Sequence, residues 1–146
     1  NKLKKNLPKY IHSFPINKTE IINAILANKQ NLKKIINVIH FEIRKKMNLF
    51  LKKNRNKKII ILDVPLLLEN KISKKKDILI FVKTKKKDVL KRLKKRKNFN
   101  QKILNKFKSI QLPLDYKKKK SNFIIKNDFS NNSVKKSVKN ILKQIL

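Results

Sequence analysis

The sequence predicts an α/β fold, in which helices cover a parallel β-sheet. Two observations predict it. Three short runs are rich in β-branched residues and show no polar alternation, which is typical of strands buried on both faces of a parallel sheet. Segments with apolar residues at helical spacing lie before, between and after these runs, and such alternation implies right-handed crossovers. With 146 residues, the chain is long enough for one domain with a buried core.

The first half of the chain is predicted to be helical. Residues 20–27 form a short amphipathic segment, and Thr19 has the side chain of an N-cap in front of it. From Leu32 to Leu51, apolar residues recur at helical spacing, which predicts a helix of about five turns. The residues that carry this spacing between the two leucines are Ile35, Ile36, Ile39, Ile43 and Met47.

The periodicity changes at Lys58, where the predicted strands begin. Residues 58–63 are a continuous apolar run that ends in Asp63, and residues 77–82 and 122–125 are two further runs of this kind. Ligands of parallel α/β sheets bind at the carboxyl ends of the strands. We expect Asp63 to lie at such an end.

Three later segments complete the alternation. Residues 86–97, 100–110 and 133–146 carry apolar residues at helical spacing, and a serine caps the last of them. The chain contains no glycine, so turns with positive φ need another residue. We expect asparagine in that role, because its short polar side chain tolerates the left-handed region.

The composition is strongly basic but not that of a disordered polycation. The formal net charge is +34, from 42 basic and 8 acidic residues, while 40% of the residues are hydrophobic. Such a charge attracts nucleotides, nucleic acids or acidic membrane surfaces. The excess of Lys, Asn and Ile also fits adenine- and thymine-rich codons, which would account for most of the charge without any function.

Cysteine usage and hydropathy bound the compartment. The chain has no cysteine, hence no disulfide, thiolate metal site or cysteine nucleophile. It shows no signal-peptide pattern, and its longest apolar run, residues 59–68, is interrupted by Asp63 and Pro65 and is shorter than the ~18 residues of a membrane span. We expect a cytoplasmic protein.

Arginine is informative because the chain favours lysine so strongly. Only four of the 42 basic residues are arginine, namely Arg44, Arg55, Arg92 and Arg96. A retained guanidinium indicates a site that needs planar, bidentate geometry. Arg92 and Arg96 are four residues apart and would project from one face of the helix 86–97, where they could grip a polyphosphate. An ordinary basic surface helix explains the same spacing.

Two of the eight carboxylates lie within seven residues, at Asp63 and Glu69. An aspartate at a strand end can hold magnesium through water or orient a hydroxyl nucleophile. The alternative is that Asp63 caps a turn and Glu69 lies on a solvated helix face. The spacing alone does not choose between them.

In their order and spacing, these motifs together resemble the dephospho-coenzyme A kinase family. The resemblance covers residues 19–146. Residues 63–70 resemble the family's signature of a hydrophobic strand followed by Pro-Leu-Leu and a glutamate. Arg92 and Arg96 stand where the family has an Arg-x-x-x-Arg pair. The further matching positions are Ile72, the run 77–82, Gln111 and, less well, Ile125-Lys126-Asn127 against an Ile-Asp-Asn-like segment. His40 is followed by Phe41, where the family has proline.

The resemblance implies a P-loop kinase-like three-layer fold with a parallel sheet and with helical substrate and lid regions. It implies one domain: a helical coenzyme A side (19–53), core strands (58–83), lid-like helices (86–120), and a last strand and helix (122–146). The implied reaction moves the γ-phosphate of ATP, with Mg²⁺, to the ribose 3′-hydroxyl of dephospho-CoA, the last step of coenzyme A biosynthesis.

The resemblance also implies roles for individual residues. Arg92 and Arg96 would contact phosphates from the lid, and Asp63 would complete the catalytic set. Asn127 would lie near the adenine. The substrate side would consist of His40, Arg44, Leu67 and Glu69, although His40 has a competing interpretation as a packed helix histidine. No residue is assigned as a direct metal ligand.

One departure from the family pattern is the absence of glycine. A phosphate-cradling loop needs glycines, because its backbone N–H groups must approach the phosphates closely. Since the downstream motifs are in order and the chain begins with Asn, we expect an N-terminally truncated kinase that is inactive alone. The alternatives are a basic nucleic-acid-binding protein, although no recognition module or aromatic platform stands out, and another P-loop nucleotide kinase.

Overall fold

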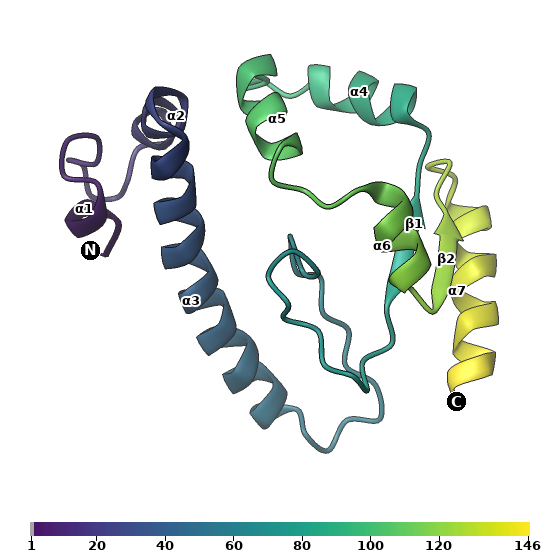
Figure 1. Cartoon of the computed structure of the whole chain (residues 1–146). Helices are drawn as coiled ribbons and strands as arrows, with labels where there is room; N and C mark the ends of the chain where they lie inside the picture. Colours follow the sequence, from purple (N-terminus) through teal and green to yellow (C-terminus); the bar gives the residue numbers. More distant parts are fainter. Residues whose placement is uncertain (1) are drawn as a thin grey trace. The chain divides into compact units, whose positions relative to one another are not determined.

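The computed structural model describes residues 2–146, which divide into two compact units (Figure 1). The first unit runs as far as Pro65 and includes Lys102–Phe107. The second comprises Leu66–Gln101 and Lys108–Leu146. Within residues 2–146, no helix combines the length and the apolar character that crossing a bilayer requires.

The first unit is helical. It contains α1 (Lys2–Asn6), α2 (Lys18–Ala27) and α3 (Lys29–Lys53), so the long helix predicted from apolar spacing is confirmed. The predicted cap is wrong by two residues. Asn17, not Thr19, is the N-cap of α2: its backbone is extended, and its side chain accepts a hydrogen bond from the Thr19 N–H at 2.9 Å.

The core of this unit lies at the N-terminal half of α3. Leu32 and Ile35 are buried there, and α3 packs against both α1 and α2. Asn31 is buried beside them and donates a hydrogen bond from Nδ2 to the Ala24 carbonyl at 3.0 Å, which satisfies an orphan group at the end of α2. The remaining buried apolar side chains of the unit are Leu7, Ile11, Ala24 and Ile25.

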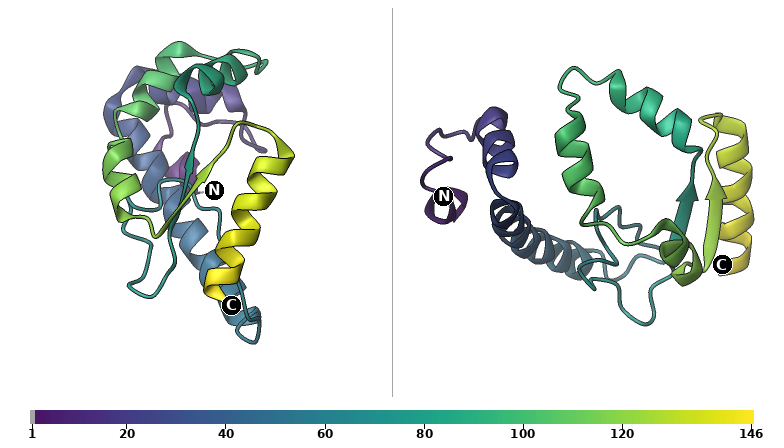
Figure 2. Two further views of the ribbon diagram at one scale, coloured as in Figure 1. Left: turned by 90° about the vertical axis from the view of Figure 1, so that its right-hand side faces the viewer. Right: turned by 45° about the horizontal axis from the view of Figure 1, so that its top comes forward.

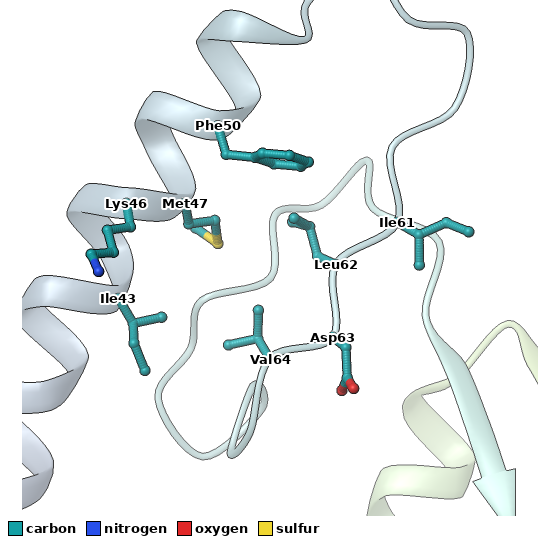
Figure 3. A pocket seen from close by; sticks show the side chains of 8 residues that line it. All are labelled: Ile43, Lys46, Met47, Phe50, Ile61, Leu62, Asp63 and Val64. Atoms are coloured by element: carbon teal, nitrogen blue, oxygen red, sulfur yellow. The ribbon is translucent and has the colours of Figure 1, made fainter.

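The strand predicted for residues 58–63 is wrong. This segment has no regular secondary structure, and Ile61 is 83% exposed. Its side chains still alternate, with Leu62 and Val64 directed toward α3 and Asp63 directed away from it (Figure 3). A strand exists only through hydrogen bonds to a neighbouring strand, and no segment of residues 2–146 pairs with this run.

The second unit contains the sheet. Strands β1 (Ile80–Lys83) and β2 (Phe123–Lys126) pair in parallel, with Ile80 opposite Phe123. The predicted strands 77–82 and 122–125 and their parallel pairing are thereby confirmed, although β1 begins three residues later than expected. Helix α7 (Asn131–Ile145) lies along β2 in all three views (Figures 1 and 2). The α/β class is confirmed, with a sheet that has two strands within residues 2–146.

Three short helices connect these elements. Helix α4 (Lys86–Lys94) ends three residues before its predicted end, and α5 (Gln101–Lys108) matches its predicted segment. Helix α6 (Leu114–Lys120) was not predicted, because its run of four lysines has no apolar periodicity. Helix α7 begins two residues before the predicted start, since Ser130 is its N-cap and accepts from the Ser133 N–H.

The residues with positive φ are not the expected asparagines. Among the described residues they are Leu66, Lys71 and Phe129, with φ of 55°, 50° and 66°. Instead, asparagine side chains stabilise two of these turns through hydrogen bonds to the backbone. Asn70 donates from Nδ2 to the Leu66 carbonyl at 2.7 Å, and a second asparagine accepts from the Phe129 N–H at 2.8 Å. The asparagine side chain supplies the hydrogen bond while its neighbour adopts the strained backbone.

Candidate functional site

The predicted site residues fall into both units. Asp63, His40 and Arg44 belong to the first. Those of the second unit are Leu67, Glu69, Arg92, Arg96 and Asn127.

His40 and Arg44 are four residues apart on α3, so they lie near one face of that helix. They differ in exposure. His40 is 9% exposed, whereas Arg44 is exposed. The burial of His40 favours the packed-histidine interpretation, and Arg44 is the member of the pair that a ligand can reach.

Asp63 lines a shallow depression of about 280 Å³ on the first unit. The depression is mainly apolar: Met47 and Phe50 of α3 face Leu62 and Val64 across it (Figure 3). The Asp63 carboxylate points away from these side chains and is exposed. The prediction that Asp63 ends a strand is wrong, because no strand forms there.

Glu69 lies in a tight turn over residues 66–72 and is largely buried. Its side chain is 10% exposed, which excludes the solvated-face alternative. Oε1 accepts hydrogen bonds from Lys117 Nζ at 2.6 Å and from the Leu112 N–H at 2.9 Å. The Glu69 carboxylate therefore links the turn that carries Leu67 with two other parts of the chain. These are α6, through Lys117, and the segment before α6, through the Leu112 N–H.

The pKa of Glu69 reflects two opposed effects. Burial of the carboxylate raises the pKa, but the hydrogen bonds from Lys117 and from the Leu112 N–H outweigh it, so the pKa of Glu69 is lowered overall. The carboxylate is consequently charged in the folded protein at neutral pH.

We expect Glu69→Gln to lower the free energy of unfolding by about 1.5–3 kcal/mol at pH 7, the usual range for hydrogen bonds to a charged group. The amide can still accept from the Leu112 N–H, but it leaves the half-buried Lys117 ammonium without its counter-ion. Because the folded pKa is lowered, this contribution is complete above the ordinary glutamate pKa of about 4.3 and is lost as the pH falls through the folded value.

Urea titrations of both proteins at pH 7 and at acid pH measure this difference, which should shrink at acid pH. Glu42→Gln is the matched control. Its ion pair with Lys2 is exposed, with side chains 43% and 60% accessible, so its loss should change stability little. A Glu69 variant as stable as the Glu42 variant would contradict the role of Glu69 in linking the turn over residues 66–72 to α6.

Arg92 and Arg96 do not share a helix face, contrary to the prediction. Arg92 lies in the last turn of α4, which ends at Lys94. Arg96 lies in a tight turn beyond it, where its N–H bonds to the Leu93 carbonyl at 3.1 Å, three residues back. Both guanidinium side chains are exposed.

Arg92 stacks on an aromatic ring that the sequence did not single out. Its guanidinium carbon lies 4.2 Å from the centroid of Phe129. Phe129 follows β2 in the turn that begins at Asn127, so the structure brings Arg92 and the Asn127 turn together. An exposed phenylalanine in a polar segment has no periodicity that would have identified it.

Asn127 continues the sheet beyond its last paired residues. Its N–H donates to the Lys83 carbonyl of β1 at 2.8 Å, and its side chain accepts from the Phe129 N–H. Both parallel strands therefore end here, with Arg92 beside the turn. This is the sheet edge at which parallel α/β proteins bind ligands.

Residues 2–146 contain no cluster of three or more His, Cys, Asp or Glu side chains that could hold a metal ion. A single exposed carboxylate such as Asp63 can still contribute to Mg²⁺, which commonly binds one or two carboxylates together with phosphate oxygens and water.

Comparison with known proteins gives one consistent result. A family model described as dephospho-CoA kinase matches residues 15–133. The dephospho-CoA kinase of Wolbachia pipientis wMel is 31% identical over 140 residues, which cover 94% of this chain and 71% of the relative. That of Rickettsia conorii (strain Malish 7) is 31% identical over 141 residues, with coverage of 97% and 72%. That of Bartonella quintana (strain Toulouse) is 25% identical over 123 residues, with coverage of 78% and 63%.

Proposed function

The chain belongs to the dephospho-CoA kinase family, and from this premise we infer that it acts in the ATP-dependent phosphorylation of the ribose 3′-hydroxyl of dephospho-CoA. It is thus a phosphotransferase of coenzyme A biosynthesis. The match of the family model over residues 15–133 carries this conclusion, and relatives with 31% identity support it.

We propose that the carboxyl end of the small parallel sheet is the nucleotide side of the site. Arg92 would contact phosphate oxygens there, with Arg96 beyond the end of α4, and Asn127 would lie near the adenine. Three observations support this assignment: the Asn127 N–H just after β2 bonds to Lys83, the last residue of β1; Arg92 lies against the following turn; and both guanidiniums are exposed. Transferred phosphoryl groups spread negative charge over their oxygens, which planar guanidiniums can neutralise through paired N–H donors.

We propose that Arg44 of the first unit and Leu67 of the second each contribute to binding of the acceptor substrate, with support from the residues that hold them. Arg44 is exposed on α3 and can pair with the pyrophosphate of dephospho-CoA. Leu67 lies in the turn that Glu69 fixes through Lys117, which supports a shaping role for Glu69 rather than a direct contact with substrate. His40, which is buried on the same helix, would support Arg44 by packing.

Magnesium is proposed as the cofactor of ATP, and Asp63 is the residue that would hold it. Its exposed carboxylate has the hard oxygen donors that Mg²⁺ prefers. When bound with ATP, magnesium supplies positive charge at the phosphate oxygens. The chain's own groups bind and orient: the guanidiniums hold phosphates, and Asp63 fixes the cation or the attacking hydroxyl.

The P-loop itself is not assigned to any of these residues. A loop that cradles phosphates through closely approaching N–H groups is built with glycine, and the 146 residues contain none. We propose that these residues provide the lid, acceptor and adenine sides of a three-layer P-loop kinase-like fold, and that alone they do not complete turnover. A cytoplasmic location, where ATP and dephospho-CoA are available, belongs to the same proposal.

We expect the purified chain to bind dephospho-CoA more tightly than ADP, which carries the same adenosine and pyrophosphate but lacks the pantetheine arm. Calorimetric titration of both ligands across a salt series measures this. The preference should persist as salt rises, because only the shared electrostatic part is screened. Arg44→Ala should weaken binding of dephospho-CoA, whereas Arg55→Ala, which removes the same charge from an exposed position after α3, should not.

Two results would contradict this proposal. One is equal affinity for the two ligands with a steep salt dependence, which is the behaviour of a polycation toward any anion. The other is tight RNA binding at physiological salt without any response to dephospho-CoA. A preference for nucleoside monophosphates would instead identify another nucleotide kinase.

A further inference from the structure

Phe129 occupies a backbone conformation that large side chains avoid. Its φ of 66° lies in the left-handed region, where the Cβ of an L-residue approaches its own carbonyl oxygen. For a bulky residue this is a genuine outlier, and such strain persists only where the surrounding structure imposes it.

The turn around Phe129 is held by polar groups that do not involve its ring. The Phe129 N–H bonds to Asn127 Oδ1, and Asp128 Oδ1 accepts from the Ser130 N–H at 2.9 Å and from the Ser133 hydroxyl at 2.6 Å. These hydrogen bonds, that of the Ser133 hydroxyl first, lower the pKa of Asp128, so its carboxylate is charged in the turn at neutral pH. A small residue at position 129 would satisfy all of these contacts.

The contact that does need the ring is the one with Arg92. Phe129 is 41% exposed, so it is not part of the buried core. The face of its ring carries the Arg92 guanidinium, with the central carbon 4.2 Å from the ring centroid.

We propose that Phe129 is a positioning residue for Arg92, held in a strained turn so that its ring supports the guanidinium at the carboxyl end of the sheet. Stacking uses the face of the guanidinium and leaves the N–H donors in its plane free for bidentate contact with phosphate. A lysine ammonium can also lie over a ring, as Lys2 does over Phe41, but it has no planar fork to present to a phosphate, which fits an arginine in a chain that otherwise prefers lysine. The inference rests on the proposed function for its phosphate ligand but not for the contact itself.

A double-mutant cycle on stability tests the contact without any enzymatic activity. Phe129→Leu, Arg92→Ala and the double variant are compared by chemical denaturation. We expect a coupling of about two- to fivefold in the unfolding equilibrium constant, the range of exposed cation–π pairs. The unfolding equilibrium constant of Phe129→Gly should be about fivefold smaller than that of Phe129→Leu. Both variants lack the ring, but only glycine relieves the backbone strain.

A kinetic comparison tests the positioning role in the natural gene product. Phe129→Leu should lower turnover at saturating ATP and dephospho-CoA by about two- to fivefold, while Phe129→Tyr, which retains an aromatic face, should restore it. Phe14→Leu is the matched control, because this ring is 85% exposed in the first unit and no aromatic–cation contact involves it among those the structure describes.

The stability cycle and the kinetic comparison distinguish a failure of this inference from a failure of the proposed function. Additive effects in the stability cycle overturn the inference, whether or not the protein is a kinase. A coupled pair in a protein that does not phosphorylate dephospho-CoA would uphold the contact and overturn the proposed function. A Phe129→Leu variant whose turnover equals that of the unsubstituted protein overturns the positioning role.

Discussion

Replacement of Arg92 or Arg96 by alanine should lower the turnover of the natural gene product by about a hundredfold. This is the usual effect of removing one preorganised donor that neutralises charge developing in the transition state. Arg92 lies at the sheet edge beside the Asn127 turn, and Arg96 follows in the turn after α4. Steady-state assays of coenzyme A formation at saturating ATP and dephospho-CoA measure the loss.

Lys95→Ala is the matched control, since it removes one positive charge between the two arginines. It should change turnover much less, because an exposed lysine is a hydrated point charge without a planar fork. Arg92→Lys separates charge from geometry, and it should recover only a minor part of the activity. Equal losses for Arg92, Arg96 and Lys95 would reduce the pair to generic positive charge.

Asp63→Asn should raise the magnesium concentration needed for half-maximal activity by at least about tenfold. The amide keeps the size of the side chain but removes the negative charge that attracts Mg²⁺, and even indirect contacts of a metal site are typically worth 10- to 100-fold. Activity measured across a magnesium titration at fixed ATP tests this. The concentration of free magnesium is corrected for the magnesium that ATP binds.

Asp77→Asn is the control for Asp63, because Asp77 is also exposed and its carboxylate is engaged locally, accepting from the Lys74 N–H at 2.8 Å. Its magnesium dependence should equal that of the unsubstituted protein. An Asp63→Asn variant that also shows the original dependence would leave Asp63 as a residue of the irregular segment without a role in the cation site.

Local sequence signals predicted α2, α3, α4, α5 and α7 and two of the three expected strands. Apolar spacing from Leu32 to Leu51 encodes α3, because a helix satisfies its own hydrogen bonds and needs only one apolar face. The run 58–63 carries an equally strong strand signal but forms none, since a strand also needs a neighbour. Helix α6 escaped prediction for the opposite reason: its lysines give no pattern, and one of them, Lys117, is held by Glu69.

The sequence could single out candidate residues for the site but not the contacts that these residues make. A scarce residue in a biased composition identified Arg92, and its exposure beside a sheet edge fits that prediction. The end of α4 before Arg96 depends on a tight turn that helical spacing cannot reveal. The role proposed for Phe129 could not be predicted, because it depends on contact with Arg92, 37 positions earlier in the chain. It also depends on a strained backbone at a position with no sequence signature.

The most direct test of the central claim is incubation of the natural gene product with dephospho-CoA and isotopically labelled ATP, followed by location of the transferred phosphate by NMR. We expect label on the ribose 3′-oxygen, in amounts that depend on dephospho-CoA, and none on adenosine or on nucleoside monophosphates offered instead. Label on a nucleoside monophosphate, or no transfer at all by a folded protein that binds RNA tightly, would contradict a role in coenzyme A biosynthesis.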